Sequence, residues 1–182
     1  MGILLAAGTS SRFGAADKLL HPVLGKPMIS HAADALRAIK LDETIAIVRA
    51  PEVAAHLLDF DCIDVSAKPP SMARSLKAGI EQAIKLDADK VLIHLGDMPF
   101  VTPSLLEDII ESCRLDAPSV TKGGQITSPP TCFPRKLLDQ LMEIDGDRGA
   151  RELLNNLPNT VEVNAAEATI ADVDKLSDIR GL

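Results

Sequence analysis

Short apolar runs alternate with helical segments along this 182-residue chain, and the alternation constrains the fold more than any other feature. Strands are predicted at residues 3–7, 43–48, 62–65, 90–95, within 118–133, 160–163 and 169–173. Helices are predicted at residues 30–39, 51–58, 75–84, 103–110, 134–142, 147–155 and 175–179. Strands that are separated by helices favour a mostly parallel sheet with helices on both sides.

The run at residues 90–95 is the strongest predicted strand, because Val91, Leu92 and Ile93 are continuously apolar rather than alternating. Such a run is typical of a central strand that is covered on both faces. No repeat, low-complexity tract or linker divides the chain. We therefore expect a single three-layer α/β domain over residues 1–182, in which a mostly parallel mixed sheet is flanked by helices.

The composition excludes several classes of function. Apolar residues make up 46% and charged residues 25%, and no apolar run approaches the roughly 20 residues of a membrane helix or resembles a signal peptide. We expect a cytoplasmic protein without a membrane partner. A net charge of −7 and an aromatic content of 2% argue against a nucleic-acid partner. Cys62, Cys113 and Cys132 lack metal or disulfide spacing and are expected to be reduced thiols.

The segment from Leu5 to Lys18 has the features of a phosphate-binding loop. An apolar strand stops at Gly8 and small residues follow, so that the backbone can approach a ligand and its N–H groups can bind an anion. Arg12 adds a planar fork for phosphate oxygens, and Lys18 adds a movable charge. The spacing matches neither the Walker loop nor the dinucleotide fingerprint. A plain strand–turn–helix with incidental cations is the alternative.

Carboxylates follow or lie within two of the predicted strands. Asp97 comes directly after the strand at 90–95, at the edge where open α/β sheets bind ligands. Its carboxylate is a candidate ligand for Mg²⁺, and a turn residue before Pro99 is the alternative. Asp172 and Asp174 would lie on one side of the predicted strand at 169–173. For these two residues, solvated carboxylates near the C-terminus are the alternative.

The string L-A-A-G-x-S-x-R-x-G-x-x-x-K at residues 5–18 resembles the signature of nucleotidyltransferases with a glycosyltransferase-A-like (GT-A type) Rossmann variant, the nucleotide-diphospho-sugar transferase superfamily. Within it, the chain resembles, nearly end to end, the MobA-like NTP transferase family and its molybdenum cofactor cytidylyltransferase branch. Further matches are G-D-M-P at 96–99, M-x-x-S-L-x-x-G at 72–79 and G-D-x-G-A-R at 146–151.

This resemblance implies a Rossmann-like fold and a nucleotide site that contains Mg²⁺. Asp97 would coordinate the metal, together with Asp174 or else Asp172. The nucleotide would be bound by Leu5, Ala6, Ala7, Gly8, Arg12 and Lys18. Of these, Arg12 and Lys18 would form the catalytic set with Asp97.

The resemblance also implies contacts around the nucleotide and the acceptor. Ser75 would either cap its helix or offer its hydroxyl to the base or the ribose. Arg148 and Arg151, three residues apart on one helix face, would lie near the acceptor. The chain departs from the family at Thr127-Ser128-Pro129-Pro130, where relatives carry Gly-His-Pro-Val, and at Lys175-Leu176, where they carry Thr-Pro. We expect an altered acceptor contact at the first departure.

The implied reaction is a Mg²⁺-dependent transfer of a nucleoside monophosphate to a molybdopterin-type phosphate, with release of pyrophosphate. Leu-Ala-Ala-Gly favours CTP, with GTP as the alternative nucleotide. A molybdoenzyme or a chaperone is a candidate protein partner. Two alternatives stay open: a sugar- or alcohol-phosphate acceptor, and a non-catalytic protein that binds a nucleotide or a cofactor.

Overall fold

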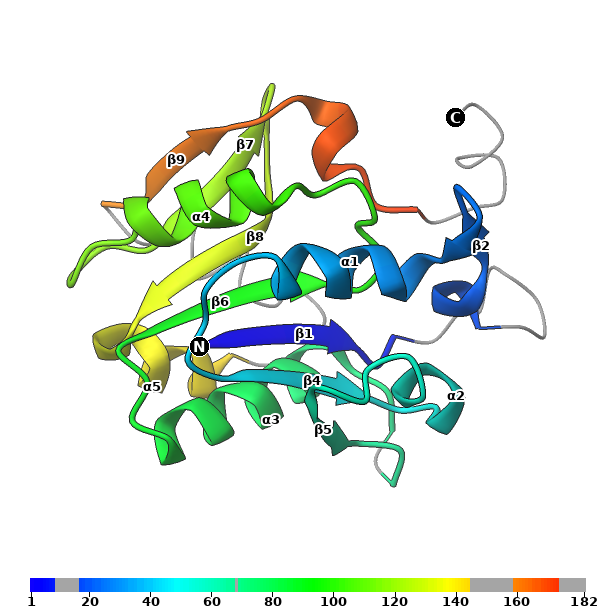
Figure 1. The fold of residues 1–182 in the computed structure, drawn as a ribbon. Helices are drawn as coiled ribbons and strands as arrows, with labels where there is room; N and C mark the ends of the chain where they lie inside the picture. The colour runs from blue at the N-terminus through cyan, green and yellow to red at the C-terminus, as the bar shows by residue number, and fades with distance from the viewer. Residues whose placement is uncertain (9–16, 68, 145–158, 174–182) are drawn as a thin grey trace.

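A seven-stranded sheet forms the centre of the computed structural model, which describes residues 1–8, 17–67, 69–144 and 159–173 (Figure 1). One half of the sheet is parallel and contains, from the edge inwards, β5 (Asp61–Asp64), β4 (Thr44–Val48), β1 (Gly2–Ala6) and β6 (Lys90–Leu95). The other half contains β8 (Ile126–Pro134), β7 (Ser119–Gly123) and β9 (Val161–Asn164). β8 is antiparallel to both of its neighbours, and β9 is parallel to β7. The predicted mixed, mostly parallel sheet is confirmed.

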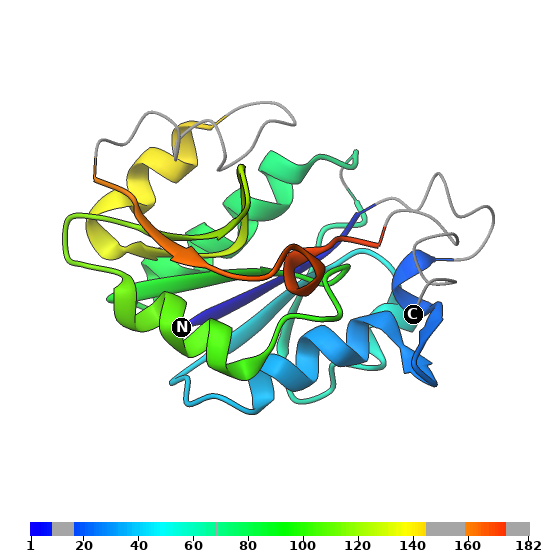
Figure 2. The ribbon, with the colours of Figure 1, turned by 90° about the horizontal axis from the view of Figure 1, so that it is seen from above.

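Helices cover both faces of this sheet, as Figure 2 shows. α1 (Met28–Arg37) and α4 (Pro103–Ser112) lie on one face, and α3 (Met72–Lys85) and α5 (Leu138–Glu143) lie on the other. Leu92 is buried in the core beneath α1 and α4, whereas its neighbours Val91 and Ile93 are buried beneath α3 and α5. The run in β6 is therefore continuously apolar because both faces of this strand are covered.

Shorter elements connect these layers. They are η1 (Lys18–Leu20), the hairpin of β2 (Pro22–Val23) and β3 (Lys26–Pro27), α2 (Pro51–Ala54), η2 (Arg135–Leu137) and η3 (Glu167–Ile170), where η marks a 3-10 helix. α2 ends four residues before the predicted end of its helix. Within the described ranges, no helix is both long and apolar enough to cross a membrane. All three cysteines are free; Cys113 and Cys132 are buried.

The strand predicted at residues 169–173 is wrong. The chain forms η3 through Ile170, and residues 171–173 have no regular structure. Ile170 and Val173 are 7% and 1% exposed, and both pack into the core beneath α1 and α4. Apolar side chains three residues apart therefore cover one face of the sheet instead of adding a strand to its edge. The helices predicted at 147–155 and 175–179 lie outside the described residues.

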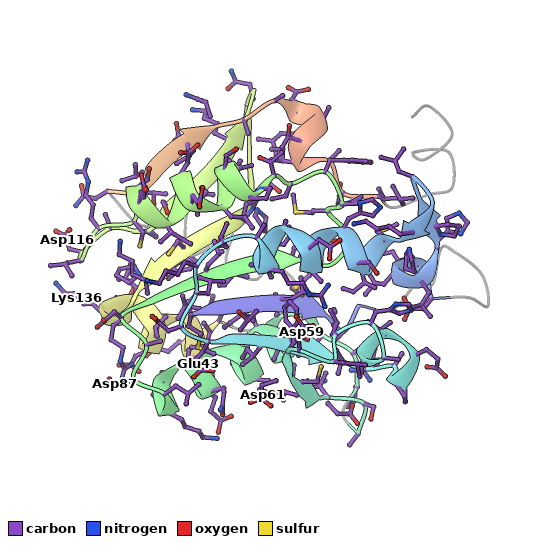
Figure 3. All side chains as sticks on the ribbon, viewed as in Figure 1. Glu43, Asp59, Asp61, Asp87, Asp116 and Lys136 are labelled. Carbon is purple, nitrogen blue, oxygen red and sulfur yellow. The ribbon has the colours of Figure 1, made fainter. Side chains whose placement is uncertain are left out.

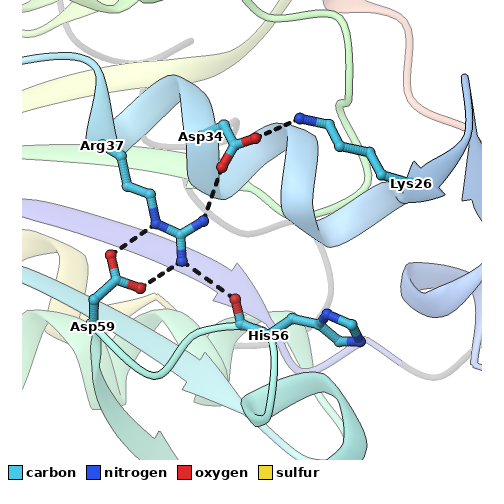
Figure 4. Close-up of polar contacts among 5 residues, drawn as sticks. All are labelled: Lys26, Asp34, Arg37, His56 and Asp59. Carbon is cyan, nitrogen blue, oxygen red and sulfur yellow. Dashed lines mark hydrogen bonds and ion pairs between the residues drawn. The ribbon is translucent and has the colours of Figure 1, made fainter.

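A network of charged side chains joins α1 to its neighbours (Figure 4). Arg37 donates to both oxygens of Asp59, to the carbonyl oxygen of His56 at 3.2 Å and to Asp34 at 2.9 Å. Lys26 on β3 pairs with the other oxygen of Asp34. The network thus connects the hairpin that follows Lys18 to α1 and to the turn after α2.

Candidate active site

The strand order changes direction between β1 and β6, and a cavity lies at their carboxyl ends. From β1 the chain builds outward through β4 to β5, and it then returns to place β6 on the other side of β1. Such a switch point is where open α/β sheets bind ligands. The cavity has a volume of about 210 Å³ and is lined by Leu5, Ala7, Gly8, Lys18, Leu19, Pro70, Ser71, Met72, Ser75, Leu95 and Asp97.

The structure brings together six of the predicted site residues from four separate segments: Leu5, Ala7, Gly8, Lys18, Ser75 and Asp97. Ala6 is not among the lining residues, because its side chain is buried in the core beneath α1 and α4. Arg12, Arg148, Arg151 and Asp174 lie outside the described residues.

Lys18 and Asp97 form an ion pair in the wall of this cavity. Lys18 Nζ lies 2.6 Å from Asp97 Oδ2, and the two side chains are 13% and 22% exposed. Lys18 is the first residue of η1, which is capped by Asp17, whose side chain accepts a hydrogen bond from Leu19 N at 3.0 Å. The fold therefore brings a cation and a carboxylate from distant parts of the sequence into one partly buried pair.

The turn after β6 places Asp97 at the end of β1. Gly96 N donates to Leu5 O at 3.0 Å. A Cβ atom at Gly96 would lie 2.8 Å from Cδ1 of Ile29 on α1, so a larger residue would push the turn away from α1. Close packing therefore favours glycine before Asp97, since any larger residue would displace at least the end of the Ile29 side chain. Gly8 differs, since a Cβ there would meet no atom of the described residues within 4 Å. Among those residues, nothing fills the space beside Gly8.

The segment after η3 reaches the same turn. Val173 N donates a hydrogen bond to Asp97 O at 3.0 Å. Asp172 is the residue directly before Val173, so its backbone lies close to that of Asp97. Asp172 is exposed and lies on irregular chain, which removes the strand geometry from which a shared side with Asp174 was predicted. In the part of the chain that the structure describes, no three His, Cys, Asp or Glu side chains form a metal-binding group.

The wall opposite Gly8 comes from the start of α3. Ser71 is the N-cap, and its side chain accepts a hydrogen bond from Arg74 N at 3.4 Å. Ser75 lies one turn inside the helix, where its hydroxyl donates to Ser71 O at 3.2 Å. The interpretation of Ser75 as the helix cap is therefore wrong, because the helix begins right after Pro69-Pro70-Ser71. Both serines line the cavity.

Arg49 is a residue that the sequence did not single out. It follows β4, the strand between β1 and β5, and donates to Ala7 O at 3.4 Å through Nε and to Ser66 O at 3.3 Å through Nη1. Ala7 lies in one wall of the cavity, and Ser66 lies in the segment that leads to the other. No local signal in the sequence marks Arg49, because its contacts depend on β4 and β5 lying beside β1.

His94 lies near the site but outside it. It is fully buried in β6, and neither ring nitrogen has a hydrogen-bond partner in the described structure. Burial lowers the pKa of His94 to about 3, because the charged imidazolium cannot be solvated there. The side chain is therefore a neutral core residue, in keeping with the absence of ligand spacing among the histidines.

The fold is that of an α/β protein with a cavity at the switch point of its sheet, where a cation and a carboxylate meet at the strand ends. The MobA-like NTP transferase domain matches residues 2–162, and the chain belongs to that family.

Three curated relatives have different names. A bifunctional enzyme IspD/IspF of Granulibacter bethesdensis is 34% identical over 62% of this chain. A bifunctional protein GlmU of Sinorhizobium medicae is 31% identical over 84%, and a probable molybdenum cofactor guanylyltransferase of Thermococcus sibiricus is 34% identical over 61%. The matches cover 30%, 35% and 54% of those proteins, respectively, so the chain spans about a third to a half of their lengths.

Solved structures share the fold. A nucleotidyl transferase from Methanothermobacter superposes with a TM-score of 0.84 at 24% identity, covering 97% of this chain and 92% of that one. A Mycobacterium tuberculosis H37Rv protein in complex with manganese gives a TM-score of 0.80 at 24% identity, covering 100% and 96%. The Rossmann-like architecture of this chain is therefore that of known nucleotidyltransferases.

Proposed function

We propose that this protein is a Mg²⁺-dependent nucleotidyltransferase that moves CMP from CTP to the phosphate of a molybdopterin-type acceptor. The observation that carries the proposal is the pair of Lys18 and Asp97 in the switch-point cavity, 2.6 Å apart and largely shielded from water. A cation that can bind phosphate and a carboxylate that can bind metal are the two groups that a triphosphate–metal complex requires at one place.

The donor set suits a metal that is shared with the nucleotide. Mg²⁺ usually takes one or two carboxylates and completes its coordination with water and phosphate oxygens. Asp97 would be the first carboxylate, and Asp174 or Asp172 the second; the bond from Val173 N to Asp97 O supports a ligand from this segment. The bound cation would neutralise charge on the phosphates.

The chain's own groups would position the reactants. An acceptor phosphate oxygen attacks the α-phosphorus of CTP, the bond from that phosphorus to the bridging oxygen breaks, and pyrophosphate leaves with the electron pair. No general base is needed, since the acceptor is already anionic. Lys18 and Arg12 hold the β- and γ-phosphates, and the backbone of Leu5-Ala6-Ala7-Gly8 and the Ser75 hydroxyl hold the nucleoside. Arg148 and Arg151 bind the acceptor.

Two observations favour alternatives to this function. The relatives include GlmU and IspD/IspF as well as a guanylyltransferase, so a sugar- or alcohol-phosphate acceptor and GTP are the closest alternatives. The departure at 127–130 from the family's Gly-His-Pro-Val keeps a non-catalytic carrier as the third alternative. A molybdoenzyme or a chaperone would receive the product in the main proposal.

A substrate panel separates these cases. Pyrophosphate release and the nucleotidyl product would be measured with CTP, GTP, UTP and ATP in Mg²⁺, each with molybdopterin, a sugar 1-phosphate or a polyol phosphate. The proposal expects a product with CTP and molybdopterin. A product with another acceptor alone would replace the acceptor, and tight nucleotide binding without any product would favour the carrier.

The substitution Lys18→Ala tests the site itself. Because Lys18 would bind the triphosphate and its developing charge, we expect turnover to fall by about a hundredfold or more, while circular dichroism and the melting temperature stay close to those of the unmodified protein. Lys136→Ala is the matched control, since Lys136 is exposed at the opposite end of the sheet (Figure 3). Unchanged turnover in Lys18→Ala would remove Lys18 from the mechanism.

A further inference from the structure

The pair of Lys18 and Asp97 is held from both sides. Leu19, next to Lys18, is 3% exposed, and Met98, next to Asp97, is 1% exposed; both pack into the core beneath α1 and α4. The backbone at Asp97 is further fixed by the bonds from Gly96 N to Leu5 O and from Val173 N to Asp97 O. The 2.6 Å contact is thus a feature of the packed fold and not of two freely rotating surface chains.

This contact opposes the binding of either ligand alone. A divalent cation that arrives alone meets a carboxylate whose charge is neutralised, and the Lys18 ammonium repels it at close range. A triphosphate that arrives alone finds Lys18 already engaged and a carboxylate beside the phosphates. When both arrive together, the cation can take Asp97 while Lys18 turns to the phosphates.

We propose that Lys18 is the counter-ion of Asp97 in the nucleotide-free site, and that an exchange of partners admits the metal and the triphosphate cooperatively. This inference rests on the proposed function. The pair has to be broken for either ligand, but it is broken only once when both bind, so each ligand raises the affinity for the other by the same factor. The species that the site selects is therefore the metal–nucleotide complex.

Asp97→Asn gives effects of opposite sign under two conditions. CTP binding would be measured by titration calorimetry in EDTA and in Mn²⁺. In EDTA the variant should bind CTP about three- to tenfold more tightly than the unmodified protein, because Lys18 is released and a like charge is lost. In Mn²⁺ it should bind CTP more weakly, because a metal ligand is lost. Weaker or unchanged binding in EDTA would overturn the inference.

Lys18→Met tests the other half of the pair. Free Mn²⁺ would be counted by electron paramagnetic resonance during titration of the nucleotide-free protein. Removal of the ammonium should raise the affinity for Mn²⁺ by about tenfold, and Lys18→Gln serves as a second neutral variant. Equal Mn²⁺ affinity in both variants and in the unmodified protein would contradict the counter-ion role.

Lys122→Met is the matched control. Lys122 forms a 2.5 Å ion pair with Glu162 between β7 and β9, and its loss should change neither Mn²⁺ nor CTP affinity. Failure of the proposed function has a separate signature, since the unmodified protein would then bind no CTP in Mn²⁺ and form no product. If it binds and turns over CTP, while Asp97→Asn lowers affinity in EDTA and in Mn²⁺ alike, only the counter-ion inference is wrong.

Discussion

Arg49 occupies a position between the two walls of the cavity. Its guanidinium donates hydrogen bonds to Ala7 O and Ser66 O, which join the end of β1 to the segment before α3. Neither bond is part of a local sequence motif, since three different strands bring the groups together. Its importance therefore follows from the strand order β5-β4-β1 and not from any spacing of residues.

The substitution Arg49→Gln should affect binding more than chemistry. Loss of the connection between the walls should raise the KM for the nucleotide by about three- to tenfold, with kcat changed less than about twofold. Arg49→Lys should recover part of the loss, because it keeps a donor there. Steady-state kinetics would measure both constants. Arg135→Gln is the control, since Arg135 pairs with Asp87 at the opposite end of the sheet (Figure 3). An equal fall in kcat would argue against a positioning role.

His94 should make the stability of the protein depend on pH. Its pKa in the folded state is about 3, below the usual 6.5 that the unfolded chain retains. Between these values only the unfolded state gains a proton, so the free energy of unfolding falls as pH drops below 6.5. From pH 7 to pH 5 the loss attributable to His94 is about 2 kcal/mol.

His94→Leu should remove this dependence, since leucine fills a similar volume without a titrating group. Urea unfolding at pH 7 and pH 5 would measure it, and the variant should lose about 2 kcal/mol less than the unmodified protein over that interval. His56→Gln removes an exposed histidine and serves as the control. Equal losses in the His94 variant and in the unmodified protein would show that burial of His94 has no such effect.

At the scale of elements, α1 depends on the network in Figure 4 for its outer contacts. The Arg37 guanidinium beside Asp59 holds the pKa of that carboxyl below its usual value, and the Lys26 ammonium does the same for Asp34. The side chains of Arg37 and Asp59 are 33% and 56% exposed, so solvent weakens each interaction. A bidentate pair within a network still contributes more than an isolated surface pair.

Arg37→Met should lower the free energy of unfolding by about 1 kcal/mol at pH 7. Because both carboxyl pKa values are lowered in the folded state, this contribution is present above their unfolded values. It should disappear as pH falls through the lowered folded values, so the difference between the variant and the unmodified protein should shrink once the pH is below the usual Asp value of 3.8. Urea unfolding at pH 7 and at a series of acidic pH values would show this. Lys26→Met removes only the Asp34 contact and should cost less; a difference that persists at low pH would point to lost packing over Phe60 instead.

Apolar patterns in this sequence correspond to strands where the residues are buried within the sheet, but not where they only pack against it. β1, β4 and β6 were predicted to within about a residue. Strands that are covered on both faces have continuous apolar runs, and such runs are easy to recognise in a sequence. The segment at 169–173 failed because Ile170 and Val173 bury side chains without forming a ladder. The start of α3 was placed too late because its cap depends on Ser71, whose role follows from Pro69-Pro70 and not from apolar periodicity.

For the molecule as a whole, the sequence predicted the layers, the strand-end residues of the cavity and Ser75 in its α3 wall, but it did not single out Ser71 or Arg49. Asp97 could be found because it directly follows the strongest strand, and Lys18 because it ends a recognisable loop. Ser71, Met72 and Arg49 meet the loop only after β4 and β5 are placed beside β1. Their proximity is set by strand order, which no local pattern contains.

The two faces of the sheet support different parts of the site. Lys18 and Asp97 are held by Leu19 and Met98 in the core beneath α1 and α4, whereas Ser75 is followed by Leu76 in the core beneath α3 and α5. Under the proposed function, changes in the α3 wall would alter which base fits without shifting the charged pair. In evolutionary terms, such a scaffold would change its nucleotide preference while it keeps its reaction, because the two traits would be supported by separate packing layers.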